Sequence, residues 1–355
     1  MNTADGTQRT QRTQRGLGLP IPSLCVLCVL CVLCVPSAFA QPQAPDKQTV
    51  AQIRQLAQTG RTAEAQERLK AYDATDPLVV YLKGLAFYHA DDHQHAIEAL
   101  LSAMSRLEVG SLERREAVQV LGLALYGEGR LTEALPYLEA TRVWAPANVE
   151  LHYFLGQAYL QLDRVDAARS ALAVSFGVPP DSAAAHLVTA QMLIRLNLDD
   201  AAEPELKRGL AKDARLPQAN FLLGQIALFR GRLKDAADLT RAEIDINPGN
   251  AIAWSQLGDV LVRESKWQEA IAMLQRSIWI NPFYSAPYIL LGQAYARNGQ
   301  PATAEGMLRR AIQYDPNNRA AHYMLAQLLQ QMKRLEEAKA EFAIAEKLVG
   351  QPGRP

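Results

Sequence analysis

Residues 251–284 read AIAWSQLGDVLVRESKWQEAIAMLQRSIWINPFY, and this stretch decides the fold. Its apolar and small residues recur at helical spacing in two blocks that Arg263–Lys266 separates. The residues that mark the two blocks and their end are Trp254, Leu257, Gly258, Leu261, Ala270, Leu274, Ser277 and Pro282. The stretch therefore predicts two short antiparallel helices, closed by a proline.

The same pattern returns at one constant interval along the chain. A small residue marks the second helix of each unit, at Ala134, Ala168, Ala202, Ala236, Ala270, Ala304 and Ala338. A second small residue lies twelve positions earlier, at Gly122, Gly156, Ala190, Gly224, Gly258, Gly292 and Ala326. Glycine inside a helix costs about 1 kcal/mol relative to alanine, so its regular return indicates that the two helices pack closely there.

These residues resemble the tetratricopeptide repeat, whose period of about 34 residues equals this interval. Prolines close most units, because proline cannot continue a helix, and they stand at Pro146, Pro180, Pro248, Pro282 and Pro316. The resemblance implies an all-α fold, a right-handed α-solenoid of stacked antiparallel helix pairs. Single units cannot bury an apolar face alone, so neighbouring units must stack.

The pattern divides the chain into five segments. Residues 1–40 resemble a cleaved secretory signal, and residues 41–46 form a polar leader that we expect to be disordered. Residues 47–114 hold two irregular repeat-like units, residues 115–352 hold seven units in 34-residue register, and residues 353–355 are a tail. Unit 183–216 lacks the usual glycine and proline and is the predicted bend.

The segment 1–40 carries three arginines, an apolar run and the small residues Ala38 and Ala40 before Gln41. This arrangement is typical of an export signal that a peptidase removes. We expect an exported chain, periplasmic or secreted, with no integral membrane span after Gln41. All four cysteines lie in the signal, so the mature chain can form no disulfide.

The composition argues against several classes of function. The whole chain has 37 basic and 37 acidic residues, and removing the signal leaves 34 and 36. A net charge of −2 is not typical of a nucleic-acid-binding protein. The sequence contains no phosphate loop, zinc-protease helix, dinucleotide fingerprint or serine-nucleophile elbow. We therefore predict no catalytic residue, no metal and no cofactor.

In proteins with this repeat, certain positions of each first helix point into a concave groove. Carrying over the ninth position gives an amide ladder of Gln157, Gln191, Gln225, Asp259, Gln293 and Gln327. An amide offers both a donor and an acceptor, so it can bind the backbone of an extended peptide. The alternative is that glutamine is simply a good exposed helix former.

Two further positions add aromatic and basic groups to the predicted groove. The fifth position supplies the expected anchors Tyr81, Tyr153, Phe221 and Tyr323. The thirteenth position supplies Arg195, Arg263 and Arg297, which suit an acidic side chain or a terminal carboxylate. These arginines can equally be ordinary solvated residues.

Histidines are the remaining candidates for catalytic or metal-binding residues. His89, His93 and His95 stand near Asp91 and Asp92, and they could be imagined as metal ligands or as part of a solvated polar turn. Three further histidines occupy the fourth position of their units, where packed aromatic rings are typical, at His152, His186 and His322.

The resulting hypothesis is a non-catalytic scaffold of the cell envelope that binds a protein or peptide partner in its groove. Exported proteins of similar repeat take part in secretion, pilus, outer-membrane or exopolysaccharide assembly, so these are the roles the resemblance implies. The alternative is an adaptor that recruits substrates to a separately encoded peptidase or glycosyltransferase. An autonomous enzyme that uses the histidine turn is a third possibility.

Overall fold

The computed structural model describes residues 44–349, which form eighteen helices. The first helices of the nine pairs are α1 (Lys47–Gln58), α3 (Pro77–Tyr88), α5 (Leu112–Gly127), α7 (Val149–Gln161), α9 (Ala183–Arg195), α11 (Ala219–Phe229), α13 (Ala251–Arg263), α15 (Ala286–Arg297) and α17 (Arg319–Gln331). The second helices are α2 (Thr62–Leu69), α4 (His93–Met104), α6 (Leu131–Trp144), α8 (Val165–Ser175), α10 (Asp199–Lys212), α12 (Leu233–Ile246), α14 (Trp267–Ile280), α16 (Pro301–Tyr314) and α18 (Leu335–Lys347). The described part of the chain contains no strand. The predicted export signal, half of the leader and the predicted tail lie outside the described residues.

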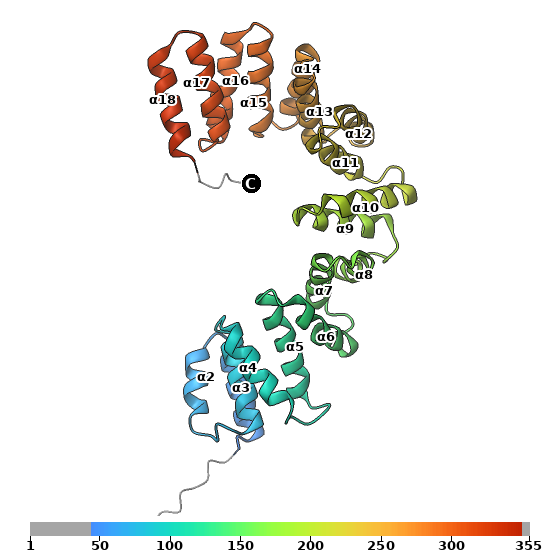
Figure 1. Ribbon diagram of the computed structural model, residues 1–355, viewed down its shortest axis with the longest axis vertical. Coiled ribbons are helices and arrows are strands. Elements are labelled where there is room, and N and C mark those ends of the chain that lie inside the picture. The colour runs from blue at the N-terminus through green and yellow to red at the C-terminus, as the bar shows by residue number, and fades with distance from the viewer. Residues whose placement is uncertain (1–43, 350–355) are drawn as a thin grey trace, which may run out of the picture.

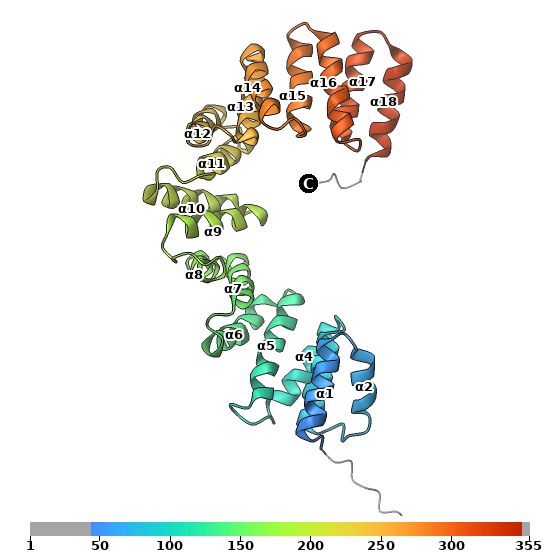
Figure 2. The ribbon, with the colours of Figure 1, turned by 180° about the vertical axis from the view of Figure 1, so that it is seen from behind.

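The helix pairs stack into an open arc (Figure 1). Around the middle of the arc, α5, α7, α11 and α13 lie on its inner side, and α6, α8, α12 and α14 lie outside them. The view from behind shows the same arrangement (Figure 2). The prediction of an all-α solenoid is confirmed. We call the surface formed by the odd-numbered helices the inner face.

The small residues do pack one helix of a pair against the other. A Cβ atom added to Gly258 would lie 2.5 Å from Leu274, and one added to Gly156 would lie 2.6 Å from Leu172. Alanines of the second-helix series are equally enclosed, and Ala168 and Ala270 are fully buried. The periodic spacing of small residues thus sets how closely the two helices approach.

Short turns inside the units share one backbone feature. One residue per turn has a positive φ, at Gly129, Asp163, Asn197, Gly231, Ser265, Gly299 and Lys333. These positions again follow the repeat period. Glycine, asparagine and aspartate enter this conformation most easily, so most of the series follows the expected chemistry.

Rings at the fourth position of several units form a hydrogen bond to the joint before them, the segment that connects one unit to the next. The Trp254 Nε1–H donates to the Pro248 carbonyl at 2.9 Å, and the Tyr288 hydroxyl donates to the Pro282 carbonyl at 2.9 Å. His152 and His322 make the equivalent contact to the carbonyls of Pro146 and Pro316. These buried histidines therefore hold the joints together.

The second helices α6 and α10 each contain a proline, and neither helix begins late. α6 begins at Leu131 and runs through Pro136, and α10 begins at Asp199 and runs through Pro204. Each proline stands in the second turn, where it removes one backbone donor. The helices continue because their apolar faces are held by the neighbouring helices.

The joint before α11, which follows the unit predicted to bend, departs from most of the others. Most first helices begin after a side-chain cap, supplied by Asp46, Asp76, Ser111, Asn148, Ser182, Asn250 and Asn318. α11 instead follows Gln218, which has a φ of 69° and offers no side-chain cap. The Gln218 backbone N–H donates to the buried carboxylate of Glu243 on α12 at 2.9 Å.

Candidate functional site

The C-terminal part of the inner face holds an open cavity of about 490 Å³ between α15 and α17. Four predicted groove residues line it: Gln293, Arg297, Tyr323 and Gln327. Gln293 and Arg297 lie one turn apart on α15, and Tyr323 and Gln327 lie one turn apart on α17. Residues four apart share one face of a helix, so the two pairs face the same space. We call this space the α15–α17 cavity.

The lining of the α15–α17 cavity combines a cation, amides and apolar surface. Arg297 is exposed and forms no ion pair within residues 44–349. Gln331 adds a third amide, and Met324 and Leu328 supply apolar walls. The Tyr323 ring is 45% exposed and lies 5.5 Å from the Phe342 ring. Such a lining can accept a carboxylate, a peptide backbone and an apolar side chain together.

The remaining members of the amide ladder differ from one another in their hydrogen-bond partners. Gln157 accepts a hydrogen bond from the Tyr126 hydroxyl at 2.9 Å, and Gln191 donates to Gln218 at 3.0 Å. Asp259 is paired with Arg263 at 3.0 Å, which neutralises both groups. Gln225 is exposed. The α15–α17 cavity brings two ladder glutamines, Gln293 and Gln327, together.

Tyr81 is the predicted anchor whose place the structure contradicts, because its side chain is fully buried. Its hydroxyl donates to Glu116 at 2.6 Å and accepts from the Arg54 guanidinium at 3.2 Å. Burial and the neighbouring Glu116 carboxylate raise the pKa of this phenol far above its ordinary value. Tyr81 therefore ties α1, α3 and α5 together and cannot serve as an exposed anchor.

Tyr153 and Phe221 are only partly exposed. The Tyr153 ring lies 6.3 Å from Phe154 and 6.5 Å from Phe176, within an aromatic group. Phe221 packs against a buried apolar cluster. Both residues belong to the wall of the inner face, and Tyr323 is the most accessible of the four predicted aromatics. Arg195 is exposed at the end of α9.

Two features of the inner face escaped the sequence analysis. A second cavity, of about 360 Å³, lies near the N-terminal end and is lined by residues of α5 and α7 together with Gln58, Tyr88 and His89. Burial raises the pKa of the Tyr88 phenol and lowers the pKa of the His89 imidazole. Phe229, 84% exposed, stands one unit from Arg195 and Arg263 at the same repeat position, and that spacing could have revealed it.

The histidine turn does not converge on a common point. His95 contacts Asp92 at 2.8 Å, while His93 reaches Glu128 of the next unit at 3.6 Å. The Asp92 carboxylate also accepts from the His95 backbone N–H and caps α4. Within residues 44–349, no group of three histidine, cysteine, aspartate or glutamate side chains is arranged to hold a metal ion.

Comparison with protein families gives matches along much of the chain. One family model, described as tetratricopeptide repeat, matches residues 125–192 and 295–348. A second model of the same description matches residues 200–251 and 221–284. The chain belongs to the tetratricopeptide repeat family.

Solved structures similar to this tetratricopeptide repeat protein include MamA residues 41-end from Desulfovibrio magneticus RS-1, at 20% identity and a TM-score of 0.44 over 47% of this chain and 95% of that chain. TTC0263, a thermophilic protein of Thermus thermophilus, is 23% identical over 48% of this chain and 93% of its own, with a TM-score of 0.42. PilF of Pseudomonas aeruginosa is 17% identical over 57% of this chain and 93% of its own, with a TM-score of 0.47.

Comparison with curated proteins gives no match for this tetratricopeptide repeat protein. Over the described residues, every helix is too short or too polar to span a bilayer. The tetratricopeptide fold supports a role in protein–protein interaction.

Proposed function

We propose that this protein is a non-catalytic scaffold that binds an extended segment of a partner protein along its inner face. The α15–α17 cavity is the principal anchor for that segment. The observation that carries the proposal is the convergence of Gln293, Arg297, Tyr323 and Gln327 on one open cavity. The export signal predicted at residues 1–40 makes an envelope protein the expected partner.

The chemistry of the cavity indicates what the partner segment contributes. Arg297 has no ionic partner within residues 44–349, so an acidic side chain or a terminal carboxylate can pair with it. Gln293 and Gln327 can each accept from and donate to a peptide backbone. Tyr323 offers a large, partly exposed ring, the type of residue that contributes most binding energy at protein interfaces.

The experiment is capture of partners from an envelope extract on immobilised protein comprising residues 41–355. A triple variant, R297A/Y323A/Q327A, removes three exposed side chains of the cavity. The matched control, Q313A/K339A/K347A, removes three exposed side chains from α16 and α18. We expect a captured partner to bind the cavity variant at least ~10-fold more weakly and the control normally.

The identity of the captured protein separates the two functions that the sequence suggests. A structural component of the envelope supports an assembly scaffold, and a stoichiometric complex with a catalytic protein supports a substrate-recruiting adaptor. Equal retention by the cavity variant and the unmodified protein would contradict the proposed anchor.

A further inference from the structure

A group of aromatic and basic side chains lies at the joint between α14 and α15. Trp279 is 72% exposed at the end of α14, and Phe283 is 76% exposed in the joint itself. They are among the most exposed large apolar side chains of the described residues. We call the edge patch the set Trp254, Arg276, Trp279, Phe283, Arg310 and Tyr314.

Ring contacts connect five members of the edge patch in two groups. The Arg276 guanidinium lies 4.2 Å from the centre of the Trp279 ring and 6.0 Å from that of Trp254. On the other side of the joint, the Phe283 and Tyr314 rings are 5.9 Å apart. The exposed aromatics are thus held at fixed positions by neighbouring rings and by a stacked cation.

The two arginines of the edge patch have no ionic partner among the described residues. Within residues 44–349, neither Arg276 nor Arg310 forms an ion pair, although both are exposed. The acidic group nearest in the chain to Tyr314 is Asp315, whose carboxylate accepts from two neutral donors, the Asn317 backbone N–H and the Asn318 amide, and so keeps its negative charge. It offsets one of the two positive charges, and the patch keeps a net charge of one positive unit over these three groups. The occupant that complements this patch therefore carries negative charge.

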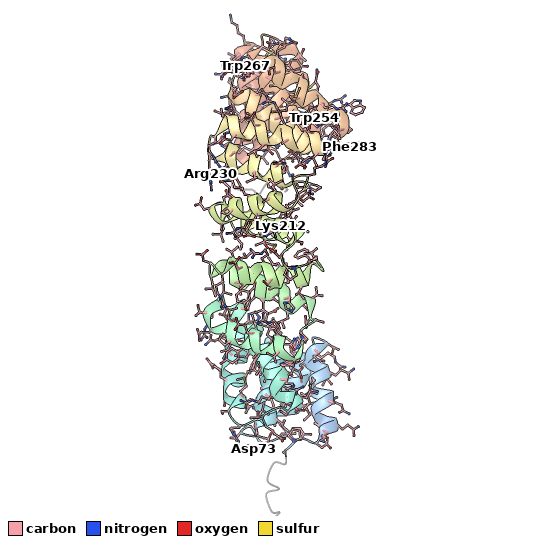
Figure 3. All side chains as sticks on the ribbon, turned by 90° about the vertical axis from the view of Figure 1, so that its right-hand side faces the viewer. Asp73, Lys212, Arg230, Trp254, Trp267 and Phe283 are labelled. Carbon is pink, nitrogen blue, oxygen red and sulfur yellow. The ribbon has the colours of Figure 1, made fainter. Side chains whose placement is uncertain are left out.

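The edge patch is separate from the proposed partner site. Figure 3, which views the arc from its convex side, places Trp254 and Phe283 at one edge of the molecule. Trp267 and Arg230 lie at the opposite edge. The α15–α17 cavity is lined by inner-face residues of α15 and α17, together with Leu308, and it shares no residue with the edge patch.

We propose that the edge patch docks the protein onto an anionic lipid surface. Tryptophan favours the boundary between lipid headgroups and acyl chains, because its ring is apolar and its N–H can still bind a polar partner. Arginines near the membrane surface are attracted by anionic headgroups. Side chains that project from an edge of the molecule can enter a soft bilayer without a complementary pocket. Docking by this edge leaves the inner face free for a partner.

The test is sedimentation of protein comprising residues 41–355 with vesicles of phosphatidylglycerol and phosphatidylethanolamine, compared with vesicles of phosphatidylcholine alone. We expect binding to the anionic vesicles and little binding to the neutral ones. The W279A/F283A variant should bind the anionic vesicles about tenfold more weakly, since two large apolar groups no longer enter the interface. R276Q/R310Q should weaken binding and reduce its dependence on salt.

The matched control is F229A, which removes an aromatic ring that is 84% exposed at the end of α11, outside the edge patch. It should bind the anionic vesicles as the unmodified protein does. Circular dichroism checks that each variant keeps its helical content. Absence of binding to anionic vesicles, or equal binding by W279A/F283A and F229A, would overturn the proposal and leave the edge patch as a surface for a protein. Either result is independent of partner capture through the α15–α17 cavity.

Discussion

Glycine at the eighth position of a unit shows how a single residue determines helix packing. An alanine in the interior of an isolated helix is more stable than a glycine by about 1 kcal/mol. At Gly258 the added methyl group would lie 2.5 Å from two atoms of the fully buried Leu274 side chain. Local helix preference and packing therefore oppose each other at this position, and packing determines the residue.

The substitution Gly258→Ala should destabilise the protein by ~1–3 kcal/mol, because Leu274 must leave its position in a filled core. Gly306→Ala is the matched control, since Gly306 lies inside α16 and a Cβ there would meet no atom within 4 Å. It should stabilise the protein by up to ~1 kcal/mol. Urea unfolding of both variants shows whether each substitution raises or lowers the free energy of unfolding. Stabilisation by both substitutions would refute the packing explanation.

Individual residues also show which side-chain environments could be predicted from the sequence. The contact of Gly258 with the second helix was predictable, because its counterpart recurs with the repeat period. The burial of Tyr81 was not, because it depends on Arg54 and Glu116, which come from two other units and have no periodic signal. The exposure of Phe229 was predictable, because it lies one repeat period from both Arg195 and Arg263.

At the scale of helices, α11 depends on a neighbouring helix for its N-terminal environment. Glu243 stands where other units have small residues such as Thr141 and Ser277. Its carboxylate accepts from the Gln218 backbone N–H, next to the positive end of α11. No described partner reaches its second oxygen, Oε2. This contact joins distant parts of the sequence and occurs in only one unit, so it could not be read from the repeat pattern.

Glu243→Ala should destabilise the protein by ~1–3 kcal/mol, because the Gln218 N–H loses its acceptor. Glu243→Gln should cost less, since a side-chain oxygen remains in place. Urea unfolding gives the two free energies, and hydrogen exchange at the Gln218 amide reports the local contact. An alanine variant no less stable than the glutamine variant would argue against the acceptor role.

Ion pairs join α10 to the unit that follows it. Glu203 accepts from Lys207 at 2.8 Å, from Arg230 at 2.6 Å and from Arg232 at 3.1 Å. The hydrogen bond from Lys207 is the largest cause that lowers the pKa of this carboxyl below its ordinary value of 4.5. Arg230 and Arg232 belong to the segment between α11 and α12, so this carboxylate connects two units.

A carboxyl with a lowered pKa stabilises the folded protein above its unfolded pKa, and this stability is lost as the pH falls through the folded pKa. Glu203→Gln should therefore lower the melting temperature at pH 7. The difference from the unmodified protein should shrink as the pH falls below 4.5. Thermal unfolding at several pH values measures it, and a difference that does not change with pH would exclude this ionic contribution.

At the scale of the whole molecule, the apolar core is long and divided. One cluster of buried apolar residues extends from Val50 to Ile226, and three smaller clusters follow between Ala227 and Ala338. Repeat arrays owe their stability to the units and to the contacts between neighbours, so separate parts of the array can unfold separately. The repeat period predicted this general arrangement, but it contained no sign of where the core divides.

Unfolding in urea should depend on the probe. Three of the four tryptophans, Trp254, Trp267 and Trp279, lie in the C-terminal half, whereas circular dichroism reports helices along the whole chain. We expect fluorescence and circular dichroism to give different midpoints. Coincident transitions would instead indicate that the array unfolds as one cooperative unit.

The spacing of the inner helices also bears on the shape of a bound partner. Neighbouring inner helices such as α13 and α15 contact each other directly, and packed helices are ~8–10 Å apart. A β-strand repeats its side chains on one face about every 7 Å. A polyproline II helix repeats with every third residue, about 9 Å. A segment that presents the same side to successive inner helices therefore fits best as a left-handed threefold helix.

Proline introduced at outward-facing positions of a captured partner peptide should preserve or strengthen its binding, and a loss of binding would contradict this match.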